Sequence, residues 1–255
     1  MKNTGLKLEP IVPDKDYILG GYGSLGGAVL QQDGQWDAYL PDNEVQSTAD
    51  FESYACVAFA TLNCVEILAR KIYGKIVNWS DRFLAIISGT EAFKGNTPQG
   101  VAETLRKKGC VNESILPFEQ PFYAPIKQNL YTLALAFIAE YSFGHEYVTP
   151  LPNDMMVALQ YSPLVFSVYA WVQDDKGLYY KPTGAKDTHA TVVYGYVEGQ
   201  YWKCFDSYFA DGILLKKIRW DALPQQCKRF TLTRQILVES AWSRFIAQLK
   251  ALLGL

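Results

Sequence analysis

The chain has 255 residues, of which 49% are hydrophobic and 20% are charged. This composition supports a substantial core in one large domain or two small ones, and it excludes an intrinsically disordered protein. The formal net charge is -2 and the sequence has no basic run, so we expect no nucleic-acid partner. The sequence also has no apolar run of about 18 residues, so we expect no membrane-spanning segment.

Five cysteines and two histidines limit the chemistry that the chain can perform. They do not cluster at the short spacings of a zinc site, so we expect neither a metal nor another cofactor. An odd number of cysteines excludes a complete disulfide framework, although one or two bridges remain open. The simplest interpretation is reduced thiols. The N-terminus has no apolar signal-peptide core, so we expect a cytoplasmic or virion-associated chain rather than a Sec-secreted one.

The first half of the chain predicts an extended arm followed by helices. Gly, Pro and Asp are frequent in residues 1–34, and a glycine run occupies residues 20–27. Apolar residues then recur at the helical period over residues 56–73 and stop before Gly74, which predicts a long central helix. Three further helices are expected over residues 101–108, 127–141 and 153–160, and a short one begins after Ser80 as its N-cap.

The second half predicts antiparallel strands. Segments rich in β-branched and aromatic residues cover 164–171, 189–196, 200–205 and 212–219, and a tight Glu198-Gly199 turn joins the second to the third. Helices followed by strands indicate an α+β fold with two lobes. We expect one domain over residues 35–235, with a helical lobe at about 46–145 and a β lobe at about 150–235.

Residues 238–255 predict a C-terminal amphipathic helix, because their apolar residues fall on one helical face. Two interpretations remain open for this helix. It docks on its own domain, or it contacts a partner or a second copy of the chain.

Cys56 is the first candidate for chemistry, because it begins the predicted central helix. The unpaired N–H groups and positive dipole end of a helix N-terminus favour the thiolate, which is the nucleophilic form of cysteine. The alternative is a small buried hydrophobe on the helix.

A cysteine nucleophile needs a base and a group that orients the base. His145 lies in a predicted turn without a companion motif, and we interpret it as a surface or structural histidine. His189 opens a predicted strand after a polar loop, and Asp206 ends the neighbouring strand of the same hairpin. Residues at facing strand ends can hydrogen-bond, so Asp206 can orient the His189 ring and stabilise its cation.

At these residues the chain resembles the papain-like cysteine peptidases. In that family a Gln lies in a loop and a Cys followed by an aromatic and small residues begins a helix. A His-Ala-apolar strand and an Asn-Ser-Trp turn come far downstream. The corresponding residues here, in chain order, are Cys56-Val57-Ala58-Phe59-Ala60, His189-Ala190-Thr191-Val192-Val193-Tyr194-Gly195-Tyr196 and Asp206-Ser207-Tyr208. Further matches, which extend the resemblance to roughly residues 35–220, are Gly109 through Glu113 to Leu116-Pro117-Phe118, Pro163 through Ser167-Val168, and Gly177-Leu178-Tyr179.

The resemblance implies a papain-like two-lobed fold and a peptidase that acts on a peptide or protein substrate. It implies Cys56 as nucleophile, His189 as base and Asp206 as the orienting group. Gln46 would share the oxyanion with the Cys56 N–H, and Tyr208 takes the place of the family's shielding Trp. Similar unsecreted chains with N-terminal arms occur in viral and bacterial genomes. Whether the arm blocks the cleft stays open.

Besides Tyr208 in place of Trp, the chain departs from the family pattern in three respects. Gln46 stands ten residues before Cys56 instead of at a short, fixed distance, Asp206 replaces the usual Asn, and the disulfide cysteines are missing. Two alternatives therefore remain. One is a papain-like structural or binding protein with weak or no activity. The other is a different cysteine acyl hydrolase, such as a peptidoglycan amidase, a transglutaminase or an isopeptidase.

Overall fold

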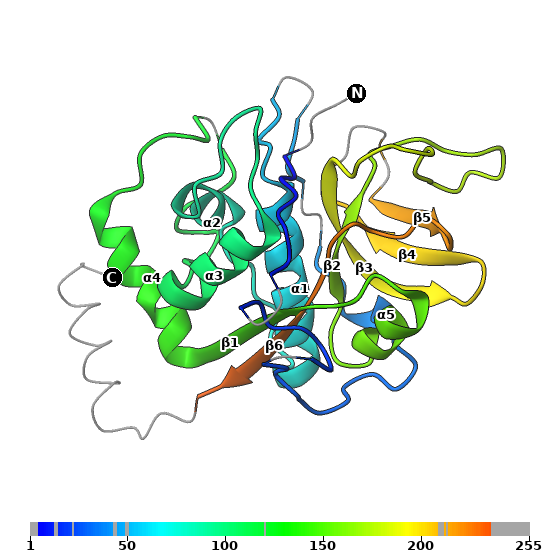
Figure 1. Ribbon diagram of the computed structural model, residues 1–255. Coiled ribbons are helices and arrows are strands. Elements are labelled where there is room, and N and C mark those ends of the chain that lie inside the picture. Colours follow the sequence, from blue (N-terminus) through cyan, green and yellow to red (C-terminus); the bar gives the residue numbers. More distant parts are fainter. Residues whose placement is uncertain are drawn as a thin grey trace.

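The computed structural model describes residues 5–12, 15–21, 23–42, 45–48, 51–119, 121–208, 212 and 214–235. Helices α2, α3 and α4 lie on one side of the long helix α1, and strands β2 to β5 lie on the other (Figure 1). The predicted α+β fold with two lobes is therefore confirmed. The bounds are η1 Asp37–Tyr39, α1 Cys56–Tyr73, α2 Asp81–Ile87, α3 Pro98–Lys108, α4 Gln128–Glu140, β1 Tyr141–Tyr147, α5 Pro152–Leu159, β2 Leu164–Val168, β3 His189–Val197, β4 Tyr201–Phe205, β5 Leu215–Arg219 and β6 Cys227–Arg234.

Helix α1 forms the centre of the molecule. It packs against β2, β3 and β6 on one side and against α2 and α3 on the other. Residues 56–69 are therefore buried without interruption, although the sequence pattern predicted a single apolar face. Two buried polar residues on this helix have internal partners: Asn63 donates to Ser207 Oγ at 3.0 Å, and Glu66 accepts from the Trp79 N–H at 2.8 Å. Gly74, in a left-handed conformation, ends the helix as predicted.

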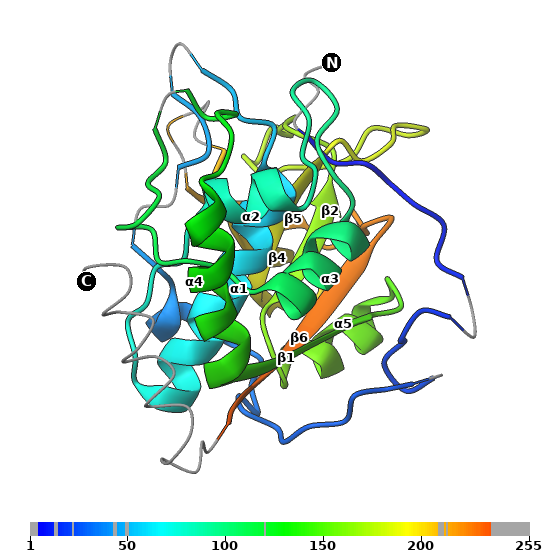
Figure 2. The same cartoon turned by 90° about the vertical axis from the view of Figure 1, so that its left-hand side faces the viewer.

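The strands form one antiparallel sheet in the order β1-β6-β2-β3-β4-β5. β1 and β6 pair along their length, from Tyr141 opposite Arg234 to Tyr147 opposite Lys228. Figure 2 shows these two strands side by side below α3, so the sheet reaches from the β lobe across the base of the helices.

Neither β1 nor β6 was predicted, and the interpretation of His145 needs correction. His145 lies on β1, not in a turn, and only 4% of its surface is exposed. Its Nε2 lies 2.9 Å from Glu103 Oε1, and its Nδ1 lies 3.2 Å from Lys228 Nζ. It is a structural histidine and not a surface one. Burial and the Lys228 charge lower the pKa of His145 to about 4.

The predicted helices agree with the observed ones to within a few residues. Ser80 caps α2 by accepting from the Phe83 N–H at 3.0 Å. Two strands are shorter than expected: the segment predicted over residues 164–171 ends at Val168, and the segment predicted over 212–219 begins at Leu215. The predicted helix over residues 238–255 lies outside the described residues.

The glycine run of the arm is anchored to a buried ion pair between Glu146 and Arg229. Glu146 Oε2 accepts from the Leu25 N–H at 2.7 Å, and Arg229 donates to the Gly26 carbonyl oxygen at 2.6 Å. Buried charges that are paired and hydrogen-bonded in this way hold the backbone that contacts them, because breaking one contact leaves a charge unsatisfied. The arm is therefore attached to β1 and β6.

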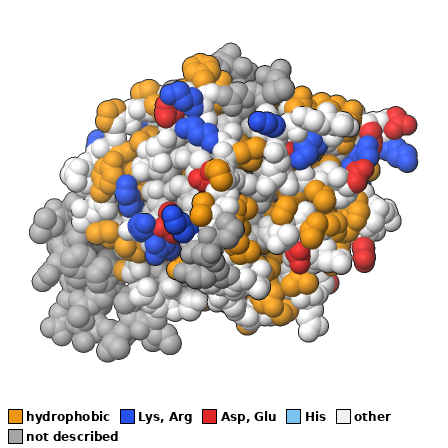
Figure 3. All heavy atoms as spheres, viewed as in Figure 1, with side chains coloured by type: hydrophobic (Ala, Val, Ile, Leu, Met, Phe, Trp, Pro, Cys, Tyr) orange, Lys and Arg blue, Asp and Glu red, His pale blue; other side chains and the backbone are white. Residues whose placement is uncertain are grey.

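All five cysteines lie among the described residues, and each is buried and outside any disulfide, as the interpretation of reduced thiols requires. Among the described helices, none is both long and apolar enough to cross a membrane. On the face seen in Figure 3, acidic and basic side chains lie among one another, and hydrophobic ones are scattered over both lobes.

Candidate active site

Cys56 is the first residue of α1, and its side chain is buried between the two lobes. Ala55 is the N-cap and offers no side-chain hydrogen bond. The N–H groups of the first helical turn therefore face the region of the thiol without a capping side chain. A partial positive charge at this end of the helix favours a thiolate there.

His189 is the first residue of β3, and its Nε2 lies 2.6 Å from Oδ1 of Asp206. β3 and β4 pair Val192 with Phe205, and extending this register by one residue sets Asp206 opposite Thr191. His189 and Asp206 are therefore diagonal neighbours on one face of the sheet, not directly opposite residues. Diagonal neighbours remain within reach of long side chains.

The ring of His189 is completely buried, and it also interacts with Cys56. Burial by itself lowers the pKa of His189, but the charge of Asp206 and the nearby Cys56 thiol raise it to about 10. Because Asp206 occupies Nε2, Nδ1 is the ring nitrogen that remains for Cys56. These two neighbours favour the protonated form of the His189 ring.

Two aromatic side chains flank the His189 ring. The centroid of Tyr208 lies 5.6 Å away and that of Trp171 5.7 Å away, with interplanar angles of 55° and 73°. Tyr208 was selected from the sequence, whereas Trp171 was not singled out because it stands at the end of a predicted strand. Together these rings shield the imidazole from water.

A cation lies behind Asp206 and was also missed in the sequence. Lys216 Nζ on β5 is 2.9 Å from Asp206 Oδ2, and neither side chain is exposed. Oδ1 of the same carboxylate faces His189 and accepts a 3.3 Å hydrogen bond from the Tyr208 N–H. The carboxylate of Asp206 thus lies between two basic side chains.

Gln46 reaches the site through a hairpin. Ser47 and Glu52 form an antiparallel bridge, and the Thr48 N–H donates to the Phe51 carbonyl oxygen at 2.8 Å. These contacts return the chain so that Ser53 Oγ donates to the Gln46 carbonyl oxygen at 2.7 Å.

Gln46 therefore packs beside the residue three positions before Cys56. Its backbone N–H donates to the Ser207 carbonyl oxygen at 2.9 Å, next to Asp206. Its side chain is buried, and its amide Nε2 donates to Glu52 Oε1 at 3.2 Å.

The N-terminal arm runs along α1 between the two lobes (Figure 1), and residues 5–7 form hydrogen bonds to both sides. On the helical side the Asn96 N–H donates to the Gly5 carbonyl oxygen and the Lys7 N–H to the Asn96 carbonyl oxygen, each at 2.8 Å. On the β side the Leu6 N–H is 3.4 Å from the carbonyl oxygen of Thr188, the residue before His189. Gly5 also packs on Tyr54, because a Cβ added to Gly5 would lie 2.1 Å from the Tyr54 carbonyl oxygen.

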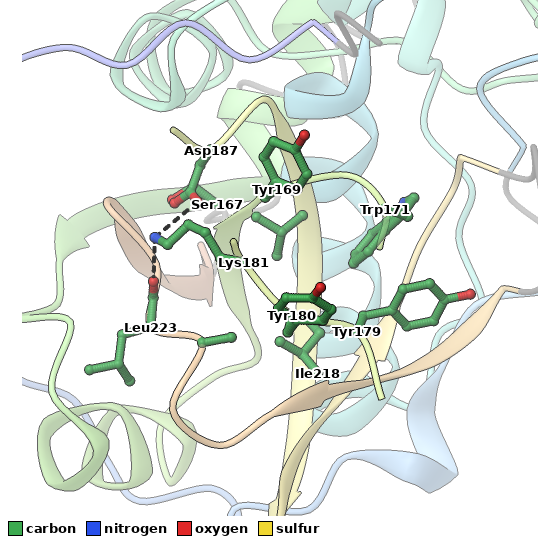
Figure 4. A pocket seen from close by; sticks show the side chains of 11 residues that line it. Ser167, Tyr169, Trp171, Tyr179, Tyr180, Lys181, Asp187, Ile218 and Leu223 are labelled. Atoms are coloured by element: carbon green, nitrogen blue, oxygen red, sulfur yellow. Dashed lines mark hydrogen bonds and ion pairs between the residues drawn. The ribbon is translucent and has the colours of Figure 1, made fainter. Parts of the chain in front are cut away.

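A small pocket opens on the β lobe beside Trp171 (Figure 4). Lys181 crosses it with its Nζ 3.1 Å from Asp187 Oδ1 and donates to the Leu223 carbonyl oxygen at 2.8 Å. Neither Cys56 nor His189 lines this pocket. Its aromatic lining is Tyr169, Trp171, Tyr179 and Tyr180.

Comparison with solved structures identifies the class of fold. The chain resembles procathepsin L 3 of the Tenebrio molitor larval midgut, with a TM-score of 0.61 and 19% identity over 90% of this chain and 76% of that one. It also resembles the bromelain protease of Ananas comosus in complex with the E64 inhibitor, with a TM-score of 0.59 and 18% identity over 78% and 98% of the two chains. The chain therefore has the papain-like two-lobed α+β fold.

A third similar structure is the proform of the ragweed pollen allergen Amb a 11, a cysteine protease. Its TM-score is 0.53, with 14% identity over 80% of this chain and 67% of that one. No family model matches the chain, and no curated protein matches it in sequence. The likeness is one of fold, and the activity has to be argued from this chain's own residues.

Proposed function

We propose that this protein is a cysteine peptidase that hydrolyses peptide bonds, with Cys56 as nucleophile, His189 as acid and base, and Asp206 as the group that orients His189. The observation that carries the proposal is the buried imidazole, which interacts with Cys56 through one side and lies 2.6 Å from Asp206 on the other. A nucleophile, a base and an orienting group in this order are the minimal set for covalent acyl transfer.

The reaction follows from these positions. The Cys56 thiolate attacks the carbonyl carbon of the peptide bond, and the carbonyl oxygen becomes an oxyanion. The His189 imidazolium then gives its proton to the leaving amine nitrogen, the C–N bond breaks, and a thioester to Cys56 remains. Neutral His189 next takes a proton from water, and the resulting hydroxide attacks the thioester. The acid product leaves and the thiolate–imidazolium pair returns.

The oxyanion would be held by the Cys56 N–H at the start of α1 and by the amide of Gln46. A primary amide has two N–H donors, and the contact with Glu52 uses one of them. The hairpin over residues 47–52 supports this role, because it removes the ten-residue separation in sequence as an obstacle.

Substrate access requires movement of the arm. Leu6 is only 8% exposed, its neighbours Gly5 and Lys7 are hydrogen-bonded to Asn96, and its own N–H donates to Thr188, the residue before His189. A peptide that is to reach these residues must displace residues 5–7. We therefore propose that the described arrangement is a closed form of the enzyme.

The proposal is tested by comparing Cys56→Ala with Cys64→Ala on a broad peptide library, with cleavage products identified by mass spectrometry. Both cysteines are buried on α1, so the pair controls for the loss of a buried thiol. We expect Cys56→Ala to lose several orders of magnitude in rate, Gln46→Ala roughly 10²–10³, and Cys64→Ala to stay active.

Equal cleavage by wild type and Cys56→Ala would refute the proposal. Casein, bacterial cell walls and ubiquitin-like conjugates should be assayed in parallel. Turnover of cell walls or of isopeptide bonds alone would reassign the site to another acyl hydrolase that uses the same residues.

A further inference from the structure

Lys216 is buried, which is unusual for a lysine. β5 alternates between exposed and buried positions, and Lys216 occupies a buried one, opposite Cys204 of β4. A buried ammonium is costly unless it is paired and hydrogen-bonded. Its ion pair with Asp206 has an N···O distance of 2.9 Å, and Nζ also donates to the Tyr208 carbonyl oxygen at 3.4 Å.

The surroundings of Lys216 hold it against the site. Its Nζ lies 5.2 Å from the centroid of the Trp171 ring and 5.9 Å from that of Tyr179. Trp171 and Tyr208 are also the two rings that flank His189. The lysine thus contacts the carboxylate and both shielding residues, but lies on the far side of the carboxylate from the imidazole.

Charge balance explains why a cation is needed at this position. The reactive form of the site contains a thiolate on Cys56, an imidazolium on His189 and a carboxylate on Asp206, which together carry one negative charge. In a buried site an uncompensated charge disfavours the ionised state that produces it. An ammonium behind the carboxylate makes the four groups neutral. A neutral Asn in place of Asp206 would need no such cation.

We propose that Lys216 is a positioning residue, which holds and neutralises the Asp206 carboxylate so that the Cys56–His189 ion pair forms without net buried charge. The inference rests on the proposed function for the role of Cys56 as nucleophile. Removing the ammonium leaves a net negative site and disfavours the thiolate. The pH at which Cys56 becomes reactive then rises.

Among the described residues, the titratable groups packed around Lys216 besides Asp206 include Tyr179 and, opposite it on β4, Cys204. His189 is faced by Cys56 from α1 and by Asp206 from the end of β4. Asp206 is faced in addition by Lys216 from β5, and the Tyr208 ring lies against His189. Within this set, the basic side chains that contact Asp206 are His189 and Lys216. The pH effect is therefore assigned to Lys216.

The experiment measures alkylation of Cys56 by iodoacetamide as a function of pH, with intact mass as the readout and Cys56→Ala as the blank. The variants are Lys216→Met, Asp206→Asn and the double variant. Lys217→Met is the matched control, because it removes the neighbouring lysine from the exposed face of the same strand. Hydrolysis of the peptide library is measured separately on untreated portions of the same protein preparations.

We expect Lys216→Met to move the alkylation midpoint upward by about one pH unit or more, since one unit corresponds to the loss of a single strong charge contact. Lys217→Met should keep the wild-type midpoint. The double variant, in which both partners are uncharged, should return most of the way to wild type. Asp206→Asn alone leaves the buried ammonium without its carboxylate partner and should be the least stable of the three.

A Lys216→Met midpoint equal to that of wild type would overturn the inference, and so would a double variant that shows no recovery. If Lys216→Met does not fold, the double variant decides: folding with a near-wild-type midpoint supports charge matching, and failure to fold overturns it. A wild type that alkylates with the expected profile but cleaves no peptide refutes the peptidase and leaves the role of Lys216 standing. Peptide cleavage without a shift in Lys216→Met refutes Lys216 alone.

Discussion

Replacing Gly5 by Ala should open the arm and expose the site. Gly5 has φ +97°, and a Cβ at this position would lie 2.1 Å from the Tyr54 carbonyl oxygen. An L-residue with this backbone conformation costs about 1–3 kcal/mol, and the contact with a backbone atom cannot be relieved by turning a side chain. The closed arm must therefore shift away from Tyr54.

The size of the effect follows from what holds residues 5–7 in place. Their two 2.8 Å hydrogen bonds to Asn96 contribute about 0.5–1.5 kcal/mol each, and burial of Leu6 contributes about 1.5–3 kcal/mol. Ordering three residues costs about 1–2 kcal/mol each, so the arm is held by a small net free energy. Losing about 2 kcal/mol raises the open population roughly 30-fold, because about 1.4 kcal/mol corresponds to a factor of ten.

The assay is the rate at which a bulky maleimide labels Cys56, measured by intact mass under conditions where arm opening precedes labelling. Gly5→Ala should label roughly 30-fold faster than wild type, in proportion to the open population. Val12→Ala is the control, because this arm residue is 43% exposed and should label at the wild-type rate. Unchanged labelling in Gly5→Ala, with the fold intact by circular dichroism, would show that the arm does not restrict access.

Two further predictions concern the histidines and the support of the Asp206 loop. The chain has only two histidines, so a ¹³C NMR titration resolves both. The His145 ring should change from imidazolium to neutral imidazole near pH 4, whereas the His189 ring should do so only at about pH 10. Because the pKa of His189 rises from about 6.5 in the unfolded chain to about 10 on folding, its stabilisation is complete below pH 6.5 and is lost as the pH rises through 10. The thermal midpoint should therefore fall across this window in wild type and fall less in His189→Gln; a His189 signal that titrates near 6.5 would contradict the burial and pairing described. Asn63→Ala should cost about 1–2 kcal/mol in the free energy of unfolding by urea and lower the peptidase rate, because the 3.0 Å bond to Ser207 is lost; a variant with wild-type stability would show that this bond does not support the loop.

The local sequence pattern was sufficient to predict the helix and strand that carry the candidate site. The apolar period and Gly74 predicted α1 with its observed ends, because helix start and stop depend on nearby residues. The strand opened by His189 and the turn at Glu198-Gly199 were predicted for the same reason. Residue order also pointed to His189 and Asp206, which the structure brings within 2.6 Å of each other.

Pairings between distant segments were not predictable from the pattern. β1 and β6 are separated by nearly the whole β lobe in sequence, and each is stabilised as a strand by the other. Propensity alone cannot report such a partner. His145 was placed in a turn for this reason, and its burial depends on Glu103 and Lys228 from two other elements.

By itself, the sequence determined the α+β fold, the helix that begins at Cys56 and the strand that begins at His189, because short-range periodicity and turn residues encode these features. Only the tertiary structure decided which charges and rings surround the imidazole. Lys216 stands beside Lys217, and two adjacent lysines on a strand do not reveal which one faces the core. The register of β5 against β4 determines this, since it places Lys216 on the inner face, where its ammonium pairs with the Asp206 carboxylate.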